Sequence, residues 1–199
     1  GLPFFAPLYN ANSDVRLHAG HLAGDKYDLH GIIGTMLMKD PVFPVPSSLI
    51  EKACSFNDYD CGHEFDLDGG ILITTGQLNH PNGAFGYRIE FEGKIIAICT
   101  DTEHFEGRID DNVVALAKDA DIMVYDAAYT EESYPNFKGW GHSTWQEAIK
   151  VADAANVKQT FLFHHDPSHS DDVMDKIAKE VSLIRGGVRP AIEGETVTV

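Results

Sequence analysis

The sequence predicts an α+β fold in which sheet layers are covered by helices, and three observations lead to this expectation. The last part of the chain alternates between strand and helix patterns in the order βαβαβ. The middle of the chain carries a β-hairpin pattern, which a purely parallel sheet would lack. The chain has 199 residues, of which 43% are hydrophobic, enough for one domain with a substantial core. We therefore expect residues 1–199 to form a single domain.

The first third of the chain is irregular in pattern and rich in proline, glycine and aromatic residues. Residues 15–18 are predicted to form a short strand. Residues 29–38 have the pattern of a short helix, which Gly31 and Gly34 weaken because glycine loses much backbone entropy in a helix. The N-terminal part is therefore expected to supply few regular elements.

The middle of the chain has a clearer strand pattern. Residues 71–75 are a run of apolar and β-branched residues that predicts a strand. Residues 85–91 and 94–100 predict two more strands. Glu92-Gly93 joins them as a tight turn, where glycine tolerates the positive φ that such a turn requires.

The later elements follow from apolar periodicity and capping residues. Asp110 or Asp111 can cap one helix, and Ser143-Thr144-Trp145-Gln146 fits a capping box that opens another. The predicted elements are a helix at 112–118, a strand at 121–125, a helix from 145, a strand at 158–163, a helix at 171–183 and a strand at 191–199.

The composition is strongly acidic. Lys and Arg number 15 against 31 Asp and Glu, which gives a net charge of −16. A protein that binds phosphate backbones needs a basic face, so nucleic acid is not an expected partner, although bound metal ions can supply positive charge locally. The 3 cysteines form no even disulfide framework, and no apolar run approaches the ~20 residues of a membrane helix. We expect a cytoplasmic protein without a membrane partner.

Candidate metal ligands follow the predicted strands, where a rigid backbone presents side chains to a cleft. The residues in such positions are His80, Asp101, His142 and His164. Imidazoles and a carboxylate at one sheet edge suit a divalent cation such as zinc. For each residue alone, a helix cap or a structural hydrogen bond is an alternative function. The segment 164–169, rich in histidine, also fits a polar loop that caps the next helix.

An ordered set of short motifs resembles metallo-β-lactamase-fold hydrolases, and more narrowly the branch of tRNase Z-like and phosphoribosyl cyclic phosphodiesterase-like enzymes. Each motif alone is weakly specific, and the set in this order is fairly specific over residues 70–170. The motifs are Leu78-Asn79-His80, Gly86-Tyr87-Arg88-Ile89, Thr100-Asp101-Thr102, Asp126-Ala127-Ala128-Tyr129, Gly141-His142-Ser143-Thr144 and Phe163-His164-His165. The resemblance implies an αββα sandwich with a binuclear metal site at one sheet edge.

The resemblance also implies a function for each matched residue. His80 would bind the first metal ion, Asp101 would bridge the two ions, and His164 would bind the second ion. His142 matches the histidine that protonates the leaving oxygen, and Asp126 matches its acidic partner. The implied cofactors are two divalent ions, zinc or alternatively manganese or iron.

Three further residues are expected to contact the substrate. By the same resemblance, His165 and His169 would face the substrate or support the metal ligands. Arg88 is a basic residue near the expected site, which can contact a phosphate or project from the hairpin into solvent.

The sequence departs from the family in one respect. The signature motif His-x-His-x-Asp-His is absent, whereas residues 1–7 resemble the segment that follows this motif in the family. We therefore hypothesise that the chain is the C-terminal portion of a longer metallo-β-lactamase-like fold. The chain alone is expected to be weakly active or inactive, and to form a homo-oligomer or to associate with the missing N-terminal segment.

The predicted function is metal-dependent hydrolysis of a small phosphodiester, such as a cyclic nucleotide or a sugar phosphate. Metal-activated water would attack phosphorus while His142 protonates the leaving oxygen. Two alternatives stay open: hydrolysis of a thioester or lactone at the same site, and a metal-binding or assembly module that has lost catalysis.

Overall fold

The structure is a computed structural model that describes residues 2–20 and 28–199. The chain divides into two compact units, residues 1–61 and residues 62–199. The expectation of a single domain stays a prediction, and each unit is described by itself. All the candidate site residues belong to the second unit. No described helix is long and apolar enough to cross a bilayer.

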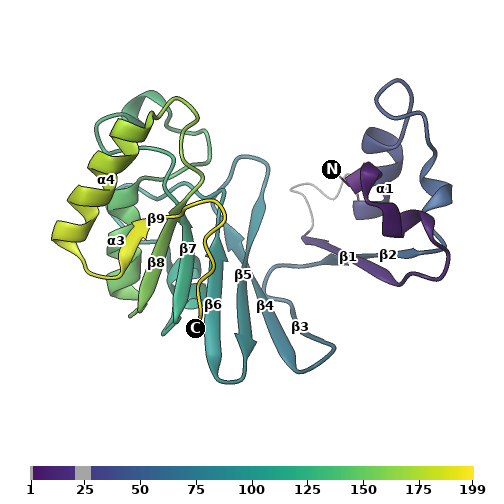
Figure 1. The fold of residues 1–199 in the computed structure, drawn as a ribbon, viewed down its shortest axis with the longest axis horizontal. Helices are drawn as coiled ribbons and strands as arrows, with labels where there is room; N and C mark the ends of the chain where they lie inside the picture. The colour runs from purple at the N-terminus through teal and green to yellow at the C-terminus, as the bar shows by residue number, and fades with distance from the viewer. Residues whose placement is uncertain (1, 21–27) are drawn as a thin grey trace. The chain divides into compact units, whose positions relative to one another are not determined.

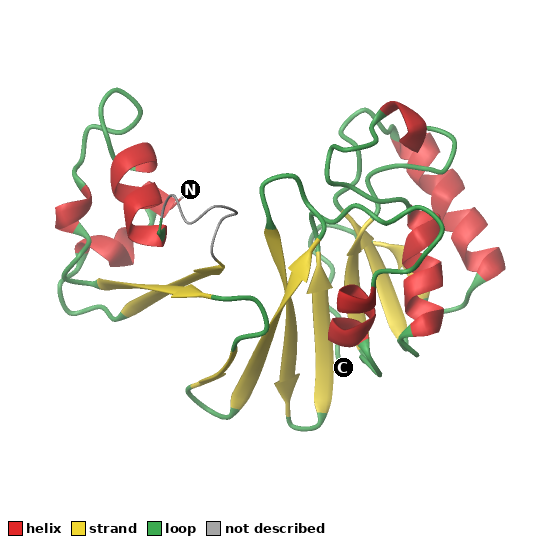
Figure 2. Cartoon of the chain, turned by 180° about the vertical axis from the view of Figure 1, so that it is seen from behind, coloured by secondary structure: helices red, strands yellow, loops and turns green. Residues whose placement is uncertain are grey.

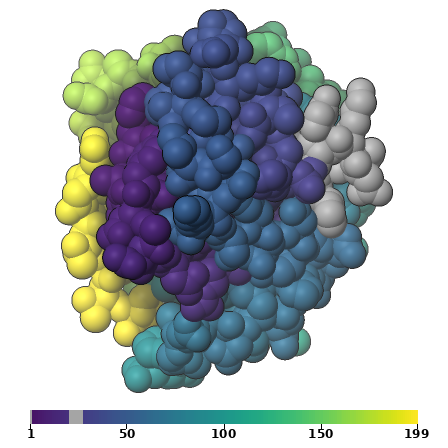
Figure 3. Space-filling view, turned by 90° about the vertical axis from the view of Figure 1, so that its right-hand side faces the viewer, coloured from purple at the N-terminus to yellow at the C-terminus, as the bar shows by residue number. Residues whose placement is uncertain are grey.

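The first unit is built on a two-stranded parallel sheet (Figure 1). β1 (Val15–Gly20) pairs along its whole length with β2 (Cys54–Tyr59), a strand that the sequence did not predict. The predicted helix at 29–38 forms as α1 (Leu29–Ile32), which continues into a wider helical turn, Ile33–Leu37. Further short turns are Leu2–Phe4, Ala6–Tyr9 and Ser47–Leu49. Figure 3 shows one face of this unit in purple and blue.

The second unit contains a seven-stranded sheet with the strand order β3-β4-β5-β6-β7-β8-β9. Neighbouring strands are antiparallel from β3 to β6 and parallel from β6 to β9. The strands are β3 (Glu64–Leu67), β4 (Ile71–Leu78), β5 (Ala84–Phe91), β6 (Lys94–Cys99), β7 (Ile122–Asp126), β8 (Gln159–Phe163) and β9 (Val188–Pro190). The hairpin of β5 and β6 turns at Glu92 and Gly93, as predicted, and both residues have a positive φ.

Three helices cover one side of this sheet (Figure 2). They are α2 (Asp111–Ala117), α3 (Trp145–Ala154) and α4 (Asp171–Ile184). The carboxylate of Asp110 caps α2 by accepting the amide proton of Asn112, as predicted. The cap of α3 lies one residue later than predicted, because Thr144, and not Ser143, accepts the amide proton of Glu147 at 3.2 Å.

The main core lies between the sheet and these helices. Side chains alternate along the strands, so Met123 and Tyr125 of β7 face the helices and are fully buried. Val124 lies on the other side, in a hollow whose wall includes residues of the C-terminal segment. The predicted strand at 191–199 is wrong: the last strand is β9, and Pro190 has no N–H with which to extend the ladder. The segment after it crosses the face of the sheet instead (Figure 1).

Candidate metal centre

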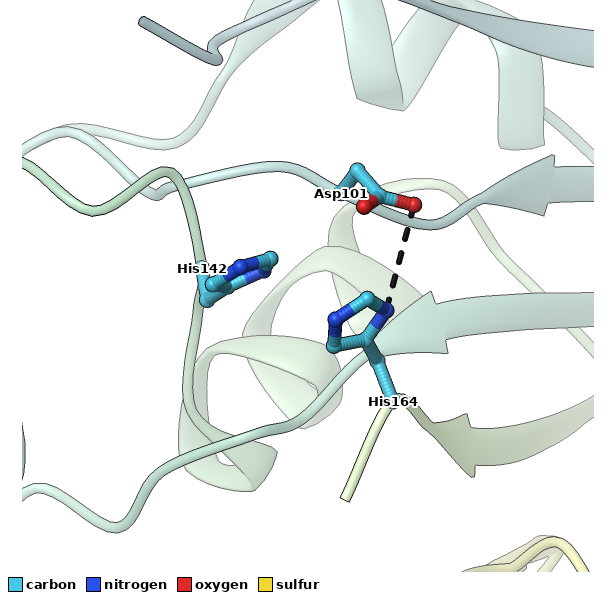
Figure 4. Close-up of side chains that lie close together, drawn as sticks. All are labelled: Asp101, His142 and His164. Carbon is cyan, nitrogen blue, oxygen red and sulfur yellow. Dashed lines mark ion pairs between the residues drawn. The ribbon is translucent and has the colours of Figure 1, made fainter. Parts of the chain in front are cut away.

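Three predicted site residues meet at the edge where the parallel strands end. Asp101 follows β6, His164 follows β8, and His142 lies in the loop before α3. One potential ligand atom from each lies within 4.8 Å of the other two. In Figure 4 the two imidazole rings and the carboxylate point toward a common space. The carboxyl ends of neighbouring parallel strands share one edge, and this topology joins residues that are distant in the sequence.

The backbone holds two of these residues in an uncommon conformation. Asp101 has φ 57° and His164 has φ 61°, both in the left-handed region. In a residue other than glycine, this left-handed conformation costs of order 1 kcal/mol and persists only where the surrounding structure imposes it. The turn redirects each side chain at the end of its strand, and Asp101 Oδ2 lies 3.8 Å from His164 Nδ1. The local strain therefore serves to converge the two side chains.

Asp126, the last residue of β7, orients His142. It is fully buried, and its Oδ2 accepts a proton from Nδ1 of His142 at 2.8 Å. The amides of Thr102, Ala128 and Ser143 also donate to this carboxylate. Burial raises the pKa of Asp126, and the hydrogen bond from His142 opposes that rise. With its Nδ1 proton held by Asp126, His142 presents Nε2 to the space that it shares with Asp101 and His164.

A second buried carboxylate, that of Glu103, holds the loop that leads to His142. Its oxygens accept protons from the Tyr134 hydroxyl at 2.6 Å, the Gly139 amide at 2.7 Å and the Gly141 amide at 2.9 Å. Burial alone would raise the pKa of Glu103, but these hydrogen bonds outweigh burial and its pKa lies below the usual value. Glu103 has no defined function in the sequence analysis. The only signal was a carboxylate two residues past Asp101.

His80 lies beside this group of three residues but is not one of them. Its ring meets the ring of His142 edge-on, with centroids 5.8 Å apart. Its Nδ1 is buried and has no hydrogen-bond partner among the described residues. A buried, unpartnered imidazole nitrogen beside two imidazoles and a carboxylate is a donor set that fits zinc or a similar divalent ion.

Among the predicted substrate residues, Arg88 lies elsewhere. Its guanidinium donates to Glu90 and to the carbonyl oxygens of Leu116 and Lys118, at the C-terminal end of α2. The contact between Arg88 and a phosphate stays a prediction. These hydrogen bonds do not favour it, because they hold the guanidinium at the end of α2. His165 lines the same cavity as His142 and His164. His169 lies in the same loop, and its Nδ1 is buried without a partner among the described residues.

A cavity of about 540 Å³ opens beside the group of three residues. Aromatic side chains form part of its wall, and the turn at residues 165–168 forms another part. This volume is within the range of small-molecule sites.

A family model described as the beta-lactamase superfamily domain matches residues 27–165, well over half of the chain. The chain belongs to this superfamily. The resemblance stated from the sequence is therefore confirmed. Ribonuclease Z of Streptococcus mutans is 35% identical over 125 residues, which are 59% of this chain and 36% of that protein. The chain thus spans about a third of the length of this curated relative.

Solved structures of the superfamily share the fold. A diphosphatase from the PhnP family superposes with a TM-score of 0.63 at 15% identity. The superposition covers 99% of this chain and 63% of the diphosphatase chain. Zn²⁺-bound PqqB from Methylobacterium extorquens superposes with a TM-score of 0.64 at 16% identity. The superposition covers 96% of this chain and 67% of the PqqB chain. The predicted α+β, metallo-β-lactamase-like fold is confirmed.

Replacing Gly141 with alanine is expected to disturb His80. Gly141 has φ 92°, and a Cβ there would lie 2.3 Å from the Cδ2 of His80. We expect Gly141→Ala to lower the free energy of unfolding by about 2–4 kcal/mol in urea titrations followed by circular dichroism. Gly139→Ala is the control, because Gly139 has φ 86° but open space around its Cβ position. Equal losses in both variants would contradict a steric effect on His80.

Proposed function

We propose that this chain carries one side of the active site of a metal-dependent phosphodiester hydrolase. The observation that supports this proposal most is the convergence of Asp101, His142 and His164 within 4.8 Å. The relatives named Ribonuclease Z favour a phosphodiester substrate, because a ribonuclease cleaves phosphodiester bonds. These relatives also weigh against our expectation that nucleic acid is not a partner, which stays a prediction.

We propose two divalent ions, with zinc as our first choice, for which this chain provides part of the ligand set. Asp101 and His164 are the proposed ligands at the strand ends, and His80 is the proposed ligand beside them through its unpartnered nitrogen. Bound ions of this kind activate water and neutralise charge on phosphoryl oxygens. The chain's own contribution is to fix the ligands before the metal arrives, through the turns at Asp101 and His164.

His142 is the proposed proton donor to the leaving oxygen. Its Nδ1 is held by Asp126, so Nε2 is the atom that faces the cavity and carries the transferred proton. The hydrogen bond to the buried carboxylate of Asp126 fixes the orientation of the His142 ring toward the cavity. His165 and His169 are proposed to contact the substrate from the loop after β8.

We propose a small phosphodiester as the substrate. A net charge of −16 disfavours a long polyanion, and the cavity of about 540 Å³ suits a ligand of nucleotide or sugar phosphate size.

Zinc binding and hydrolysis test the proposal together. We expect the chain to bind zinc in calorimetric titrations and to hydrolyse bis(p-nitrophenyl) phosphate slowly and only with added metal. Asp101→Asn should weaken zinc binding at least ~10-fold and abolish hydrolysis. Asp119→Asn is the control, since Asp119 also has a positive φ but lies in the turn before β7, at its opposite end from the site. Hydrolysis that survives equally in both variants would contradict the proposal.

His142→Gln separates the proposed acid from a metal ligand. We expect this variant to retain zinc and to lose ~10²–10⁴-fold in rate on a cyclic nucleotide, whose leaving group is an alkoxide. The p-nitrophenyl ester needs no proton on its leaving group, so its hydrolysis should change little. A loss of zinc as large as that in Asp101→Asn would make His142 a ligand and not the acid.

A further inference from the structure

A row of aromatic rings leads from His142 to the surface. Tyr129 meets His142 edge-on at 6.2 Å, and Phe137 stacks on Tyr129 with centroids 4.5 Å apart and an angle of 5°. Trp140 meets Phe137 edge-on at 5.5 Å. Four aromatic side chains are therefore in contact, one after another, beside the candidate metal centre.

Trp140 is the exposed end of this row. It is 62% exposed, whereas Trp145 of α3 is 5% exposed and belongs to the core. Burial therefore does not account for an indole at position 140. Its backbone is nevertheless held in place, because the amides on both sides of it, those of Gly139 and Gly141, donate to Glu103. A large aromatic face that is both exposed and fixed loses little entropy when a flat ligand stacks on it.

The cavity joins this aromatic face to the candidate metal centre. Trp140 and Phe137 line it together with His142 and His164. Asp166 lines it as well, and its Oδ1 accepts the amide proton of Ser168, which leaves further acceptor sites on the carboxylate. A ligand that fills the cavity therefore meets a stacking surface, a hydrogen-bond acceptor, and His142 and His164 of the candidate metal centre.

We propose that this cavity binds the base of a nucleotide, stacked on Trp140, with the nucleotide's phosphate at Asp101, His142 and His164. A base such as adenine is flat, uncharged and carries an amino group at its edge, so it matches an aromatic wall in a strongly acidic protein. A sugar phosphate lacks such a ring and would leave Trp140 unused. The inference rests on the proposed function only for the position of the phosphate.

The fluorescence of Trp140 tests the proposal directly, because the other tryptophan is buried. Adenosine monophosphate is titrated into the zinc-loaded chain with excitation at the red edge of the indole band. We expect saturable quenching, and we expect adenosine to quench as well, with or without zinc. Ribose 5-phosphate and inorganic phosphate should leave the fluorescence unchanged. In Trp140→Leu, binding of the monophosphate measured by calorimetry should be about tenfold weaker or more.

The control is Phe91→Leu, which removes an exposed aromatic ring at the opposite end of the sheet and should leave binding unchanged. The base site would be overturned if neither the monophosphate nor adenosine quenches, or if ribose 5-phosphate binds as tightly as the monophosphate. If adenosine quenches but zinc adds nothing to the affinity for the monophosphate, the base site stands and the proposed metal-dependent phosphate site fails.

Discussion

Replacing Asp126 with asparagine is expected to slow hydrolysis of a cyclic nucleotide by ~10²–10⁴-fold with zinc retained, and to lower the free energy of unfolding by about 2–4 kcal/mol. All four groups that contact this carboxylate donate protons to it: three backbone amides and the ring of His142. Whichever of the two carboxylate oxygens the asparagine amide nitrogen replaces, that nitrogen would face an N–H group. If it faces His142, Nδ1–H loses its acceptor, so the ring must flip or change tautomer and is no longer held as in the native chain.

Asp121→Asn is the matched control for this experiment. Asp121 lies next to the start of β7, is 7% exposed, and accepts protons from the Ile95 amide and from Lys158. It is therefore another buried carboxylate, placed just before the same strand at the end away from the site. We expect Asp121→Asn to reduce stability, measured by calorimetry, without changing the rate on the cyclic nucleotide. An unchanged rate on the cyclic nucleotide in Asp126→Asn would refute the orienting function of Asp126.

Replacing Glu103 with glutamine is expected to release the loop at residues 134–141. The glutamine can accept at one oxygen only, so its amide nitrogen would face a donor, either the Gly141 amide or the Gly139 amide and Tyr134 hydroxyl. We expect a loss of about 1–3 kcal/mol in the free energy of unfolding, together with faster hydrogen exchange at Gly139 and Gly141. Glu106→Gln is the control, because Glu106 forms an exposed ion pair with Lys138 of the same loop.

The contribution of Glu103 also has a defined pH dependence. Its pKa is lower in the folded chain than its usual value of about 4.3, so the unfolded chain binds the proton more readily. The stabilisation is therefore complete above about pH 5 and disappears as the pH falls through the folded pKa. The stability difference between the wild-type chain and Glu103→Gln, followed by urea unfolding across this range, should shrink toward low pH. A difference independent of pH would show that the charge of Glu103 is not involved.

Local patterns predicted the second unit better than the first. The hairpin turn at Glu92-Gly93 and the cap at Asp110 are decided by neighbouring residues, so both were predicted. β2 was missed because its stability comes from pairing with β1, about forty residues away. Thr and Val alternate at the C-terminus and suggested a strand, but a strand also needs an available partner, and this segment crosses the sheet instead.

In the candidate site too, some residues were predicted from local motifs and others were not. Asp101, Asp126, His142 and His164 were predicted from motifs at strand ends, and the topology joins them. Glu103 was not assigned, because its partners lie more than thirty residues away and are mostly backbone amides, which leave no mark in a sequence. Arg88 was expected near a phosphate, but its position in the middle of β5 directs it to the end of α2.

The two outer strands of the seven-stranded sheet also constrain how copies of this unit can associate. β9 has three residues and ends in Pro190, which offers no N–H to an added strand. β3 has four residues, and its exposed side chains Glu64 and Asp66 would repel the same edge of a second molecule. Growth of this sheet by edge-to-edge aggregation is thus disfavoured at both ends, so a homo-oligomer of the kind expected from the sequence would have to form through another surface.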